Sequence, residues 1–224
     1  MGQYYYAVNL DKKEYIYSHD YNNGLKIMEH SYIGNELMNH VEFMLTPENG
    51  WHGNRIVWAG DYADPESVVS LRKLGCEKLA KELEELEKVS TDKVKYTKEG
   101  INIYGICAEW DKINPDMKGL SIELPRYIVN ITKRQYVDKE NLLTSGCGFI
   151  IHPLSILTCE GNGRGGGDFE CQDALPQVRQ MIYSAVGSWA RNRIIMHNEP
   201  PNRYRELIFH VKIDEYDSSE ICLK

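Results

Sequence analysis

The sequence lacks several features that would place the protein in a specialised class. No apolar run approaches the roughly 20 residues that span a bilayer, and no basic stretch followed by an apolar one opens the chain, so we expect no membrane span and no secretory signal. The six cysteines form no CxxC pair, which indicates free thiols in a reducing cytoplasm. Basic residues do not predominate, because 26 Lys and Arg stand against 33 Asp and Glu, a formal charge of −7. This balance disfavours a protein that coats nucleic acid, although it leaves room for a local basic site.

The residues that are present describe a globular chain with one unusual bias. The chain has 224 residues, of which 42% are hydrophobic and 26% charged, the usual balance of a soluble domain. A core of this size needs no disulfide or metal support. Tyrosine is frequent, with 15 residues against 4 phenylalanines. Because tyrosine packs a ring and keeps a polar tip, the bias favours half-buried strands and recognition surfaces.

The apolar periodicity predicts an α+β fold with a mainly antiparallel sheet. Strands are predicted over residues 3–9, 14–17, 55–59, 101–107, 126–131, 135–138, 189–196 and 204–213. Helices are predicted over residues 35–45, from Pro65 to Leu86, and over 177–186. The second is the one long helix, in which we expect Asp64 to be the N-cap, Pro65 the first helical residue and Gly75 a break or kink. The polar tail after Asp214 is expected to fray.

Two segments of the sequence recur in the same order. Residues 6–16 align without gaps to 127–137, with five of eleven positions identical, and residues 51–57 align to 189–195, with four of seven identical. The repeat predicts two related hairpin-containing units, unless hairpins with similar turns have converged. The predicted divisions are 1–64 for the first unit, 65–120 for a helical and mixed connection, 121–213 for the second unit and 214–224 for the tail, together forming one compact domain.

The repeat also matches individual side chains. Trp51 matches Trp189, and both are expected to be core or interface anchors. Arg55 matches Arg193, and the two arginines either pair with acidic neighbours or face a shared cleft.

Four blocks of the sequence carry a family resemblance. They are residues 1–5 with 8–16 (MGQYY and VNLDKKEYI), 58–64 (WAGDYAD), 152–154 (HPL) and 160–169 (EGNGRGGGDF). With these blocks the chain resembles a family of uncharacterised proteins from bacteriophages and bacterial genomes. The resemblance implies a phage or mobile-element setting, in which small proteins often counter host defence. It implies no activity, so no catalytic residue is carried over from it.

A glycine-rich segment opens at Gly161 and is the main candidate ligand site. Glycines allow positive φ and a close approach of the backbone to a ligand, and successive amide N–H groups can form a nest for an anion. Arg164 could add a bidentate contact to phosphate and Asp168 a contact to a ribose hydroxyl or a metal. The spacing matches neither a P-loop nor a dinucleotide fingerprint, and the alternative is a flexible connection between strands. The candidate ligand-binding residues here are Asn162, Gly163, Arg164, Gly165, Gly166, Gly167 and Asp168.

Asp61 is a further candidate ligand residue, at the end of the strand predicted over 55–59. Strand ends are frequent ligand positions in sheets covered by helices. Asp61 and Asp64 could hold a divalent cation or act as an acid/base pair. For Asp64, helix capping is the favoured alternative.

Other reactive residue types stand in patterns that favour structural roles. Cys147, His152, Cys159 and Cys171 are zinc-ligand types, but their spacing fits no common site, so no metal site is predicted. His152 could be a general base, although a satisfied structural histidine is the favoured interpretation. Cys159 could be a nucleophile beside His152, but nothing marks its thiol as activated.

Three function hypotheses follow. The first is a protein that binds a phosphorylated small molecule or nucleotide through the Gly-rich segment and so sequesters a host defence signal. The second is a protein–protein inhibitor of a host enzyme or defence complex, and the third is a metal-assisted nucleotide hydrolase that uses Asp61, Asp168 and His152. The expected partner is a phosphorylated ligand or a host protein in the cytoplasm, with membranes excluded, nucleic acid disfavoured and self-association left open. The sequence identifies neither a cofactor nor a catalytic residue, and both stay open.

Overall fold

The computed structural model describes residues 3–89, 101–114, 123–142, 150–161, 185–213 and 219–223. Within these residues the fold is α+β, as the periodicity predicts. Six of the nine strand pairings are antiparallel and three are parallel, which confirms a mainly antiparallel sheet.

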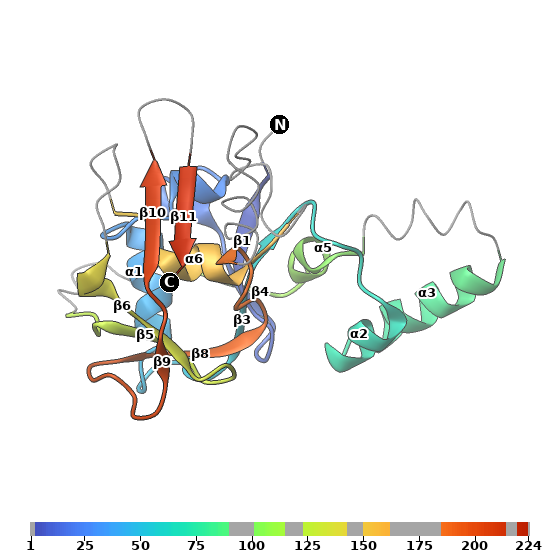
Figure 1. Ribbon diagram of the computed structural model, residues 1–224. Helices are drawn as coiled ribbons and strands as arrows, with labels where there is room; N and C mark the ends of the chain where they lie inside the picture. Colours follow the sequence, from blue (N-terminus) through green and yellow to red (C-terminus); the bar gives the residue numbers. More distant parts are fainter. Residues whose placement is uncertain are drawn as a thin grey trace.

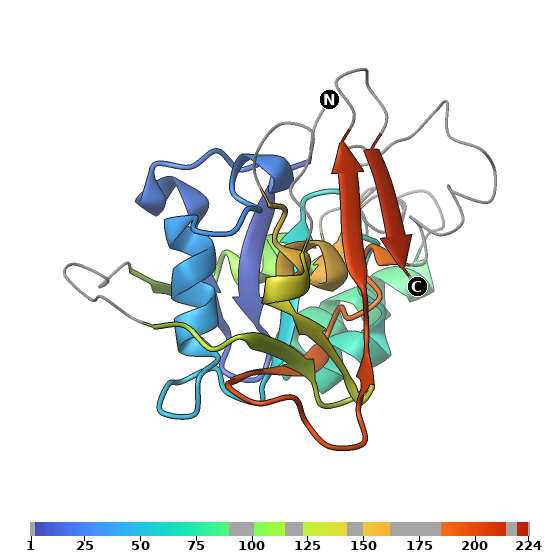
Figure 2. The same cartoon turned by 60° about the vertical axis from the view of Figure 1, so that its left-hand side comes forward.

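Nine strands form the main sheet, which occupies the body of the molecule (Figure 1). Its order is β4–β2–β1–β3–β8–β5–β6–β9, and the short β7 pairs with β3. These strands are β1 (Tyr5–Asn9), β2 (Glu14–Ile16), β3 (Arg55–Gly60), β4 (Asp111–Ile113), β5 (Tyr127–Asn130), β6 (Gln135–Asp138), β7 (Cys159–Glu160), β8 (Asn192–His197) and β9 (Arg205–Glu206). A separate ribbon joins β10 (Phe209–Ile213) to β11 (Ser219–Leu223), as Figure 2 shows.

Two β-hairpins flank the central strands β3 and β8. The hairpin β1–β2 pairs with β3, and the hairpin β5–β6 pairs with β8. In each hairpin the last residue of the first strand closes the turn through its side chain. Asn9 Oδ1 accepts the N–H of Lys12 at 3.0 Å, and Asn130 Oδ1 accepts the N–H of Lys133 at 2.9 Å. The asparagine and the lysine that follows it three residues later therefore fix both turns locally.

The two matched tryptophans are fully buried, which confirms that they are core anchors. The indole N–H of Trp51 donates to Glu14 at 2.7 Å, and the indole N–H of Trp189 donates to Gln135 at 2.9 Å. Each indole therefore satisfies its one polar group on the second strand of a hairpin, as a buried tryptophan requires.

One face of the sheet is covered by α1 (Glu36–Met44) and α6 (Pro153–Thr158). Asn35 caps α1, accepting the N–H of Leu37 at 2.9 Å, which confirms the helix predicted over 35–45. His152 caps α6 in the same way, accepting the N–H of Leu154 at 3.2 Å. Ile56 and Trp58 of β3 pack with apolar residues of both helices in one core cluster, which also includes residues of β5, β6 and β8.

The opposite face of β1 and β3 is covered by α5 (Ile103–Cys107), where the sequence pattern predicts a strand over 101–107. That prediction is wrong. Asn102 Oδ1 accepts the N–H of Gly105 at 2.9 Å, an N-cap contact that starts a helix. The short turn of helix then places Ile103 and Cys107 against Val57.

The predicted long helix is two helices, α2 (Val68–Lys73) and α3 (Glu77–Val89), which lie to one side of the body in Figure 1. Gly75 separates them with φ +68°, a conformation in which glycine ends a helix without strain. The predicted cap is also wrong, because Ser67 rather than Asp64 accepts the first free N–H, from Ser70 at 3.1 Å. The helix therefore begins three residues after Pro65.

Three other boundaries differ from the prediction, and the first is the strand predicted over 204–213, which is divided into β9 and β10 in two different sheets. The last long strand, β8, begins at Asn192, because Trp189 lies in the preceding turn. Ser219–Leu223 pairs along its length with β10, so the expected fraying is wrong for these tail residues. The helix predicted over 177–186 falls outside the described residues up to position 184.

Gly60 shows how closely β1, β3 and β7 approach. A methyl group at this position would lie 2.7 Å from the carbonyl oxygen of Glu160 and 2.9 Å from the ring of Tyr5. We expect Gly60→Ala to lower the free energy of unfolding by about 2 kcal/mol, since overpacking forces the backbone to shift. Urea denaturation measures this change. Gly50→Ala is the control, because its methyl would meet only the flexible ends of Lys12 and Met44, and an equal loss in both variants would contradict the explanation.

Candidate functional site

A cavity of about 590 Å³ lies where β7 and the turn before β8 meet the segment that leads into α2. Its volume falls in the range of small-molecule sites. The residues that line it are Asp64, Pro65, Glu66, Lys133, Cys159, Glu160, Gly161, Gly187, Ser188, Ala190 and Arg191. Five of these side chains carry formal charge, so the cavity suits a polar ligand.

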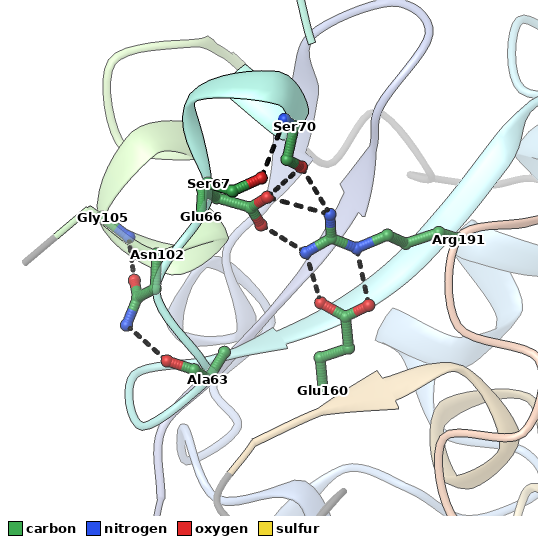
Figure 3. A network of polar contacts seen from close by, with 8 residues as sticks. All are labelled: Ala63, Glu66, Ser67, Ser70, Asn102, Gly105, Glu160 and Arg191. Carbon is green, nitrogen blue, oxygen red and sulfur yellow. Dashed lines mark hydrogen bonds and ion pairs between the residues drawn. The ribbon is translucent and has the colours of Figure 1, made fainter. Parts of the chain in front are cut away.

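Arg191 is the centre of the charged wall (Figure 3). Its Nε and Nη2 donate to the two carboxylate oxygens of Glu160, each at 2.6 Å. Nη2 also donates to Glu66, and Nη1 donates to Glu66 at 3.2 Å and to Ser70 Oγ at 3.5 Å. All three guanidinium nitrogens therefore donate hydrogen bonds within the protein and orient both carboxylates, so the role of Arg191 is to hold the wall together rather than to bind an anionic ligand.

Three separate elements bring this network together (Figure 3). Glu66 precedes α2 and is fixed by its backbone N–H, which donates to Ile101 at 2.8 Å. Glu160 ends β7. Arg191 lies in the turn before β8 with φ +60°, a left-handed conformation that is uncommon for a residue other than glycine. Such strain is retained where the surrounding contacts require it.

The two carboxylates beside Arg191 favour its protonated form. Burial would lower the pKa of Arg191, but hydrogen bonds and charge from Glu160 and Glu66 raise it above its usual range. The side chain of Glu66 is only 4% exposed, whereas that of Glu160 is 25% exposed. One guanidinium thus compensates two carboxylates, and the network keeps a net negative charge.

Two charged lining residues remain for a ligand. The ammonium of Lys133 and the carboxylate of Asp64 have no ion pair or side-chain hydrogen bond within the described part of the chain. Lys133 sits on the β5–β6 turn and Asp64 on the segment between β3 and α2. The cavity therefore presents one available cation and one available anion beside the Arg191 network.

The sequence-predicted site residues meet this cavity at one point. Gly161, the first residue of the Gly-rich segment, lines it, and a methyl group there would lie 2.0 Å from Gln3 Oε1, so the Gln3 side chain would have to shift. The remaining candidates, Asn162, Gly163, Arg164, Gly165, Gly166, Gly167 and Asp168, lie outside the described residues. Their role in binding stays a prediction.

Asp61 lies beside β1 rather than among the lining residues. Its Oδ1 accepts the N–H of Tyr4 at 3.0 Å, and its own N–H donates to the carbonyl of Tyr4 at 3.0 Å. These contacts extend the β1–β3 pairing by one residue. They give Asp61 a structural role, and ligand binding by its second oxygen stays a prediction.

His152 is a structural residue. Its Nδ1 accepts the N–H of Leu154, so the ring proton is on Nε2, which donates to Glu42 Oε1 at 2.9 Å. Both ring nitrogens are thereby engaged in the interior, where the side chain is 2% exposed. Among the described residues no group of three or more His, Cys, Asp or Glu side chains could hold a metal ion; Cys147 and Cys171 lie outside them.

The Arg191 network leaves no local pattern in the sequence. Glu66 and Arg191 are 125 positions apart, and Glu160 and Arg191 are 31 apart, so no local motif joins them. One signal was available in the repeat, where Arg191 aligns with Gly53. Gly53 also has positive φ, +71°, so an arginine occupies a position at which the matched segment has glycine.

Comparisons of the chain with protein-family models, with curated proteins and with solved structures find no match. Across the described ranges, every helix is too short or too polar to span a bilayer.

Proposed function

We propose that the protein binds a phosphorylated small molecule of the nucleotide class in the cavity beside Gly161. The observation that carries this proposal is the pairing of an available ammonium with an available carboxylate in one polar cavity of about 590 Å³. Lys133 suits a phosphate group and Asp64 suits a sugar hydroxyl, the division of roles that nucleotide sites use. In the phage setting that the family resemblance implies, such a protein would sequester a host signal.

The negative charge of the cavity wall limits the class of phosphorylated ligand that we expect to bind. A bare phosphate would meet Lys133, but also the carboxylate of Asp64 and the net negative Arg191 network. A ligand that also carries hydroxyl or amino groups can donate to those carboxylates instead of being repelled by them. We therefore expect nucleoside and sugar phosphates to bind and inorganic phosphate to bind poorly.

A thermal-shift screen tests the proposal. The panel is AMP, ATP, cyclic AMP, NAD, ribose 5-phosphate and inorganic phosphate, each with and without Mg²⁺. A ligand at 100 times its dissociation constant stabilises the fold by about 2.7 kcal/mol. The expected result is a shift with at least one nucleoside or sugar phosphate and none with inorganic phosphate.

Variants then place the ligand. Lys133→Ala and Asp64→Asn are each expected to weaken binding by about 1.5 kcal/mol, roughly tenfold, since each removes a charged hydrogen bond. Arg164→Ala tests the Gly-rich segment on the same scale. Lys81→Ala and Asp111→Asn are exposed controls outside the cavity. No shift across the panel, or equal binding by Lys133→Ala and Lys81→Ala, contradicts the proposal and favours the protein-inhibitor hypothesis.

We also infer that the two hairpin-containing halves derive from a duplicated unit. The inference is supported by the matched segments, by the equivalent closure of the turns at Asn9 and Asn130, and by the equivalent hydrogen bonds of Trp51 and Trp189. In this view the second unit is the specialised one, because it carries an arginine, Arg191, at the position matched to a glycine.

A further inference from the structure

Basic side chains gather where the two hairpin turns meet the ends of β3 and β8. Arg55 of β3 lies opposite Arg193 of β8 in the strand register. Arg193 contacts both turns: its Nη1 donates to Asp11 at 3.1 Å, and its backbone N–H donates to Thr132 Oγ1 at 3.0 Å. The strand β9 adds a further basic residue, Arg205. Its backbone N–H donates to the carbonyl of Arg134 in the β5–β6 turn at 3.0 Å. We call this surface the basic edge, and its residues are Lys12, Arg55, Lys133, Arg134, Arg193 and Arg205.

The edge is positive although the chain as a whole is acidic. Asp11 is the one acidic residue in the two turn sequences, 10–13 and 131–134, and it is bound by Arg55 at 2.7 Å as well as by Arg193. Arg55 and Arg193 thus bind the one carboxylate of the two turns, and the basic edge adds Lys12, Lys133, Arg134 and Arg205, in a chain with a formal charge of −7. An extended anion is therefore attracted to this edge and repelled by most of the remaining surface.

The two guanidiniums keep donors for such an anion. Arg55 uses Nε, and Arg193 uses Nη1, to hold Asp11; the other guanidinium nitrogens of both residues make no hydrogen bond within the described ranges. Their side chains are 33% and 51% exposed. Asp11 therefore orients two planar forks on adjacent strands, and a planar fork is the geometry that binds phosphate oxygens in pairs.

The backbone conformation gives a further observation, which concerns Arg134 of the basic edge. Five non-glycine residues of the described part have positive φ, and four of them are basic: Lys13, Arg134, Arg191 and Arg203. Glycine or asparagine is the residue expected in this conformation. Arg134 and Arg203 have no side-chain hydrogen bond or ion pair in the described ranges, so no internal contact accounts for the strain that they bear.

We propose that the basic edge binds the backbone phosphates of a nucleic-acid duplex, without reading the base sequence. Protein interfaces centre on buried Trp, Tyr or Arg anchors; the two turns contain no aromatic residue, and their one large exposed apolar side chain is Ile131, at 36%. Binding of single strands relies on aromatic stacking platforms, which neither turn contains. A duplex offers the higher density of phosphate charge, and its contacts to Lys and Arg need no such features.

Fluorescence anisotropy with a labelled 20-base-pair DNA duplex tests the proposal. If four phosphates are contacted, affinity is expected to fall about 100-fold between 50 and 200 mM salt. Duplexes of unrelated sequence are expected to bind equally, and single strands and poly-glutamate more weakly. No duplex binding at 50 mM salt, or tighter binding of poly-glutamate or of single strands, overturns the proposal.

Two variants separate binding from folding. Arg134→Gly removes a cation together with its backbone strain, so we expect an equal or higher melting temperature and about three- to tenfold weaker duplex binding. Lys12→Ala is expected to weaken binding to a similar degree, and the exposed Lys81→Ala on α3 is the control. Unchanged affinity in both edge variants overturns the assignment. Lys12 and Arg134 do not line the cavity, so nucleotide binding there stays measurable in the same variants, and either proposal can fail alone.

Discussion

Replacing Glu42 with glutamine is expected to lower the free energy of unfolding by about 3–5 kcal/mol. Glu42 lies on α1, and its carboxylate is 2% exposed. It accepts hydrogen bonds from Lys139 at 2.7 Å and from His152 Nε2 at 2.9 Å. A glutamine amide has one acceptor oxygen and two N–H donors, so it would leave the Lys139 charge or the His152 N–H without an acceptor in the interior.

The same variant predicts a change with pH. Burial would raise the pKa of Glu42, but the hydrogen bond from His152 and the charge and hydrogen bond of Lys139 lower it below its usual 4.5. A lowered pKa in the folded state contributes stability that is present above pH 4.5 and is lost as the pH falls through the folded-state value. We therefore expect the difference between the wild type and Glu42→Gln to be constant from pH 6 to 7 and to shrink below about pH 4.5.

The free energy of unfolding of Glu42→Gln must be compared with that of the wild type at each pH, because protonation of His30 also lowers the stability of both proteins in acid. Burial lowers the pKa of His30 to about 4, so the fold loses stability on acidification in both proteins alike. Glu84→Gln is the matched control, since Glu84 pairs with Arg72 at 2.8 Å on the surface, where both side chains are more than 40% exposed. It is expected to cost less than about 1 kcal/mol. Equal losses at Glu42 and Glu84, measured by urea denaturation, would contradict the role of the buried carboxylate.

Replacing Arg191 with alanine is expected to cost about 3 kcal/mol, the lower part of the range for removing one partner of a buried ion pair. Glu66 would keep the hydrogen bond from Ser70 but lose its cation, while remaining 4% exposed. The cost stays at the low end because Glu160 is 25% exposed and gains water when the arginine is removed.

Glycine at the same position separates charge from backbone strain. Alanine keeps a Cβ at φ +60°, whereas glycine does not, so Arg191→Gly is expected to be about 1 kcal/mol more stable than Arg191→Ala. Arg193→Ala, two residues later and 51% exposed, is expected to cost less than about 1 kcal/mol. If Arg191→Gly were as stable as the wild type, the network would contribute no more to folding than the backbone strain at Arg191 costs, about 1 kcal/mol.

The parts of the fold that could be predicted from the sequence are those fixed by local chemistry. Both hairpins were predicted, because Asn9 and Asn130 close their turns with contacts three residues away. The apolar spacing over 35–45 predicts the helix α1, and the structure adds the Asn35 cap. The break at Gly75 was named as an alternative, and the structure shows it.

The wrong or missing predictions concern segments whose structure depends on tertiary contacts. Residues 101–107 alternate like a strand, yet Asn102 starts a helix there, and its amide also donates to the carbonyl of Asp61 at 2.9 Å. That contact ties α5 to the end of β3, 41 positions away. The Arg191 network has the same cause, since its members come from segments up to 125 positions apart. Of the Gly-rich segment that the sequence predicts as the ligand site, Gly161 is the residue that lines the cavity within the described part of the chain.

The pairing of β3 with β8 at the centre of the sheet can form only late in the synthesis of the chain. Strands β3 and β8 pair through two residues each, and the contact of Arg193 with Gly53 there spans 140 positions. A ribosome that adds 5–20 residues per second needs roughly 7 to 30 s to make that span, whereas a hairpin closes in microseconds. The edge of β3 at Arg55 and Ile56 is thus synthesised several seconds before β8, the strand that pairs with it. The nascent chain must keep this open strand from pairing elsewhere, and the charge of Arg55 at its first position helps to do so.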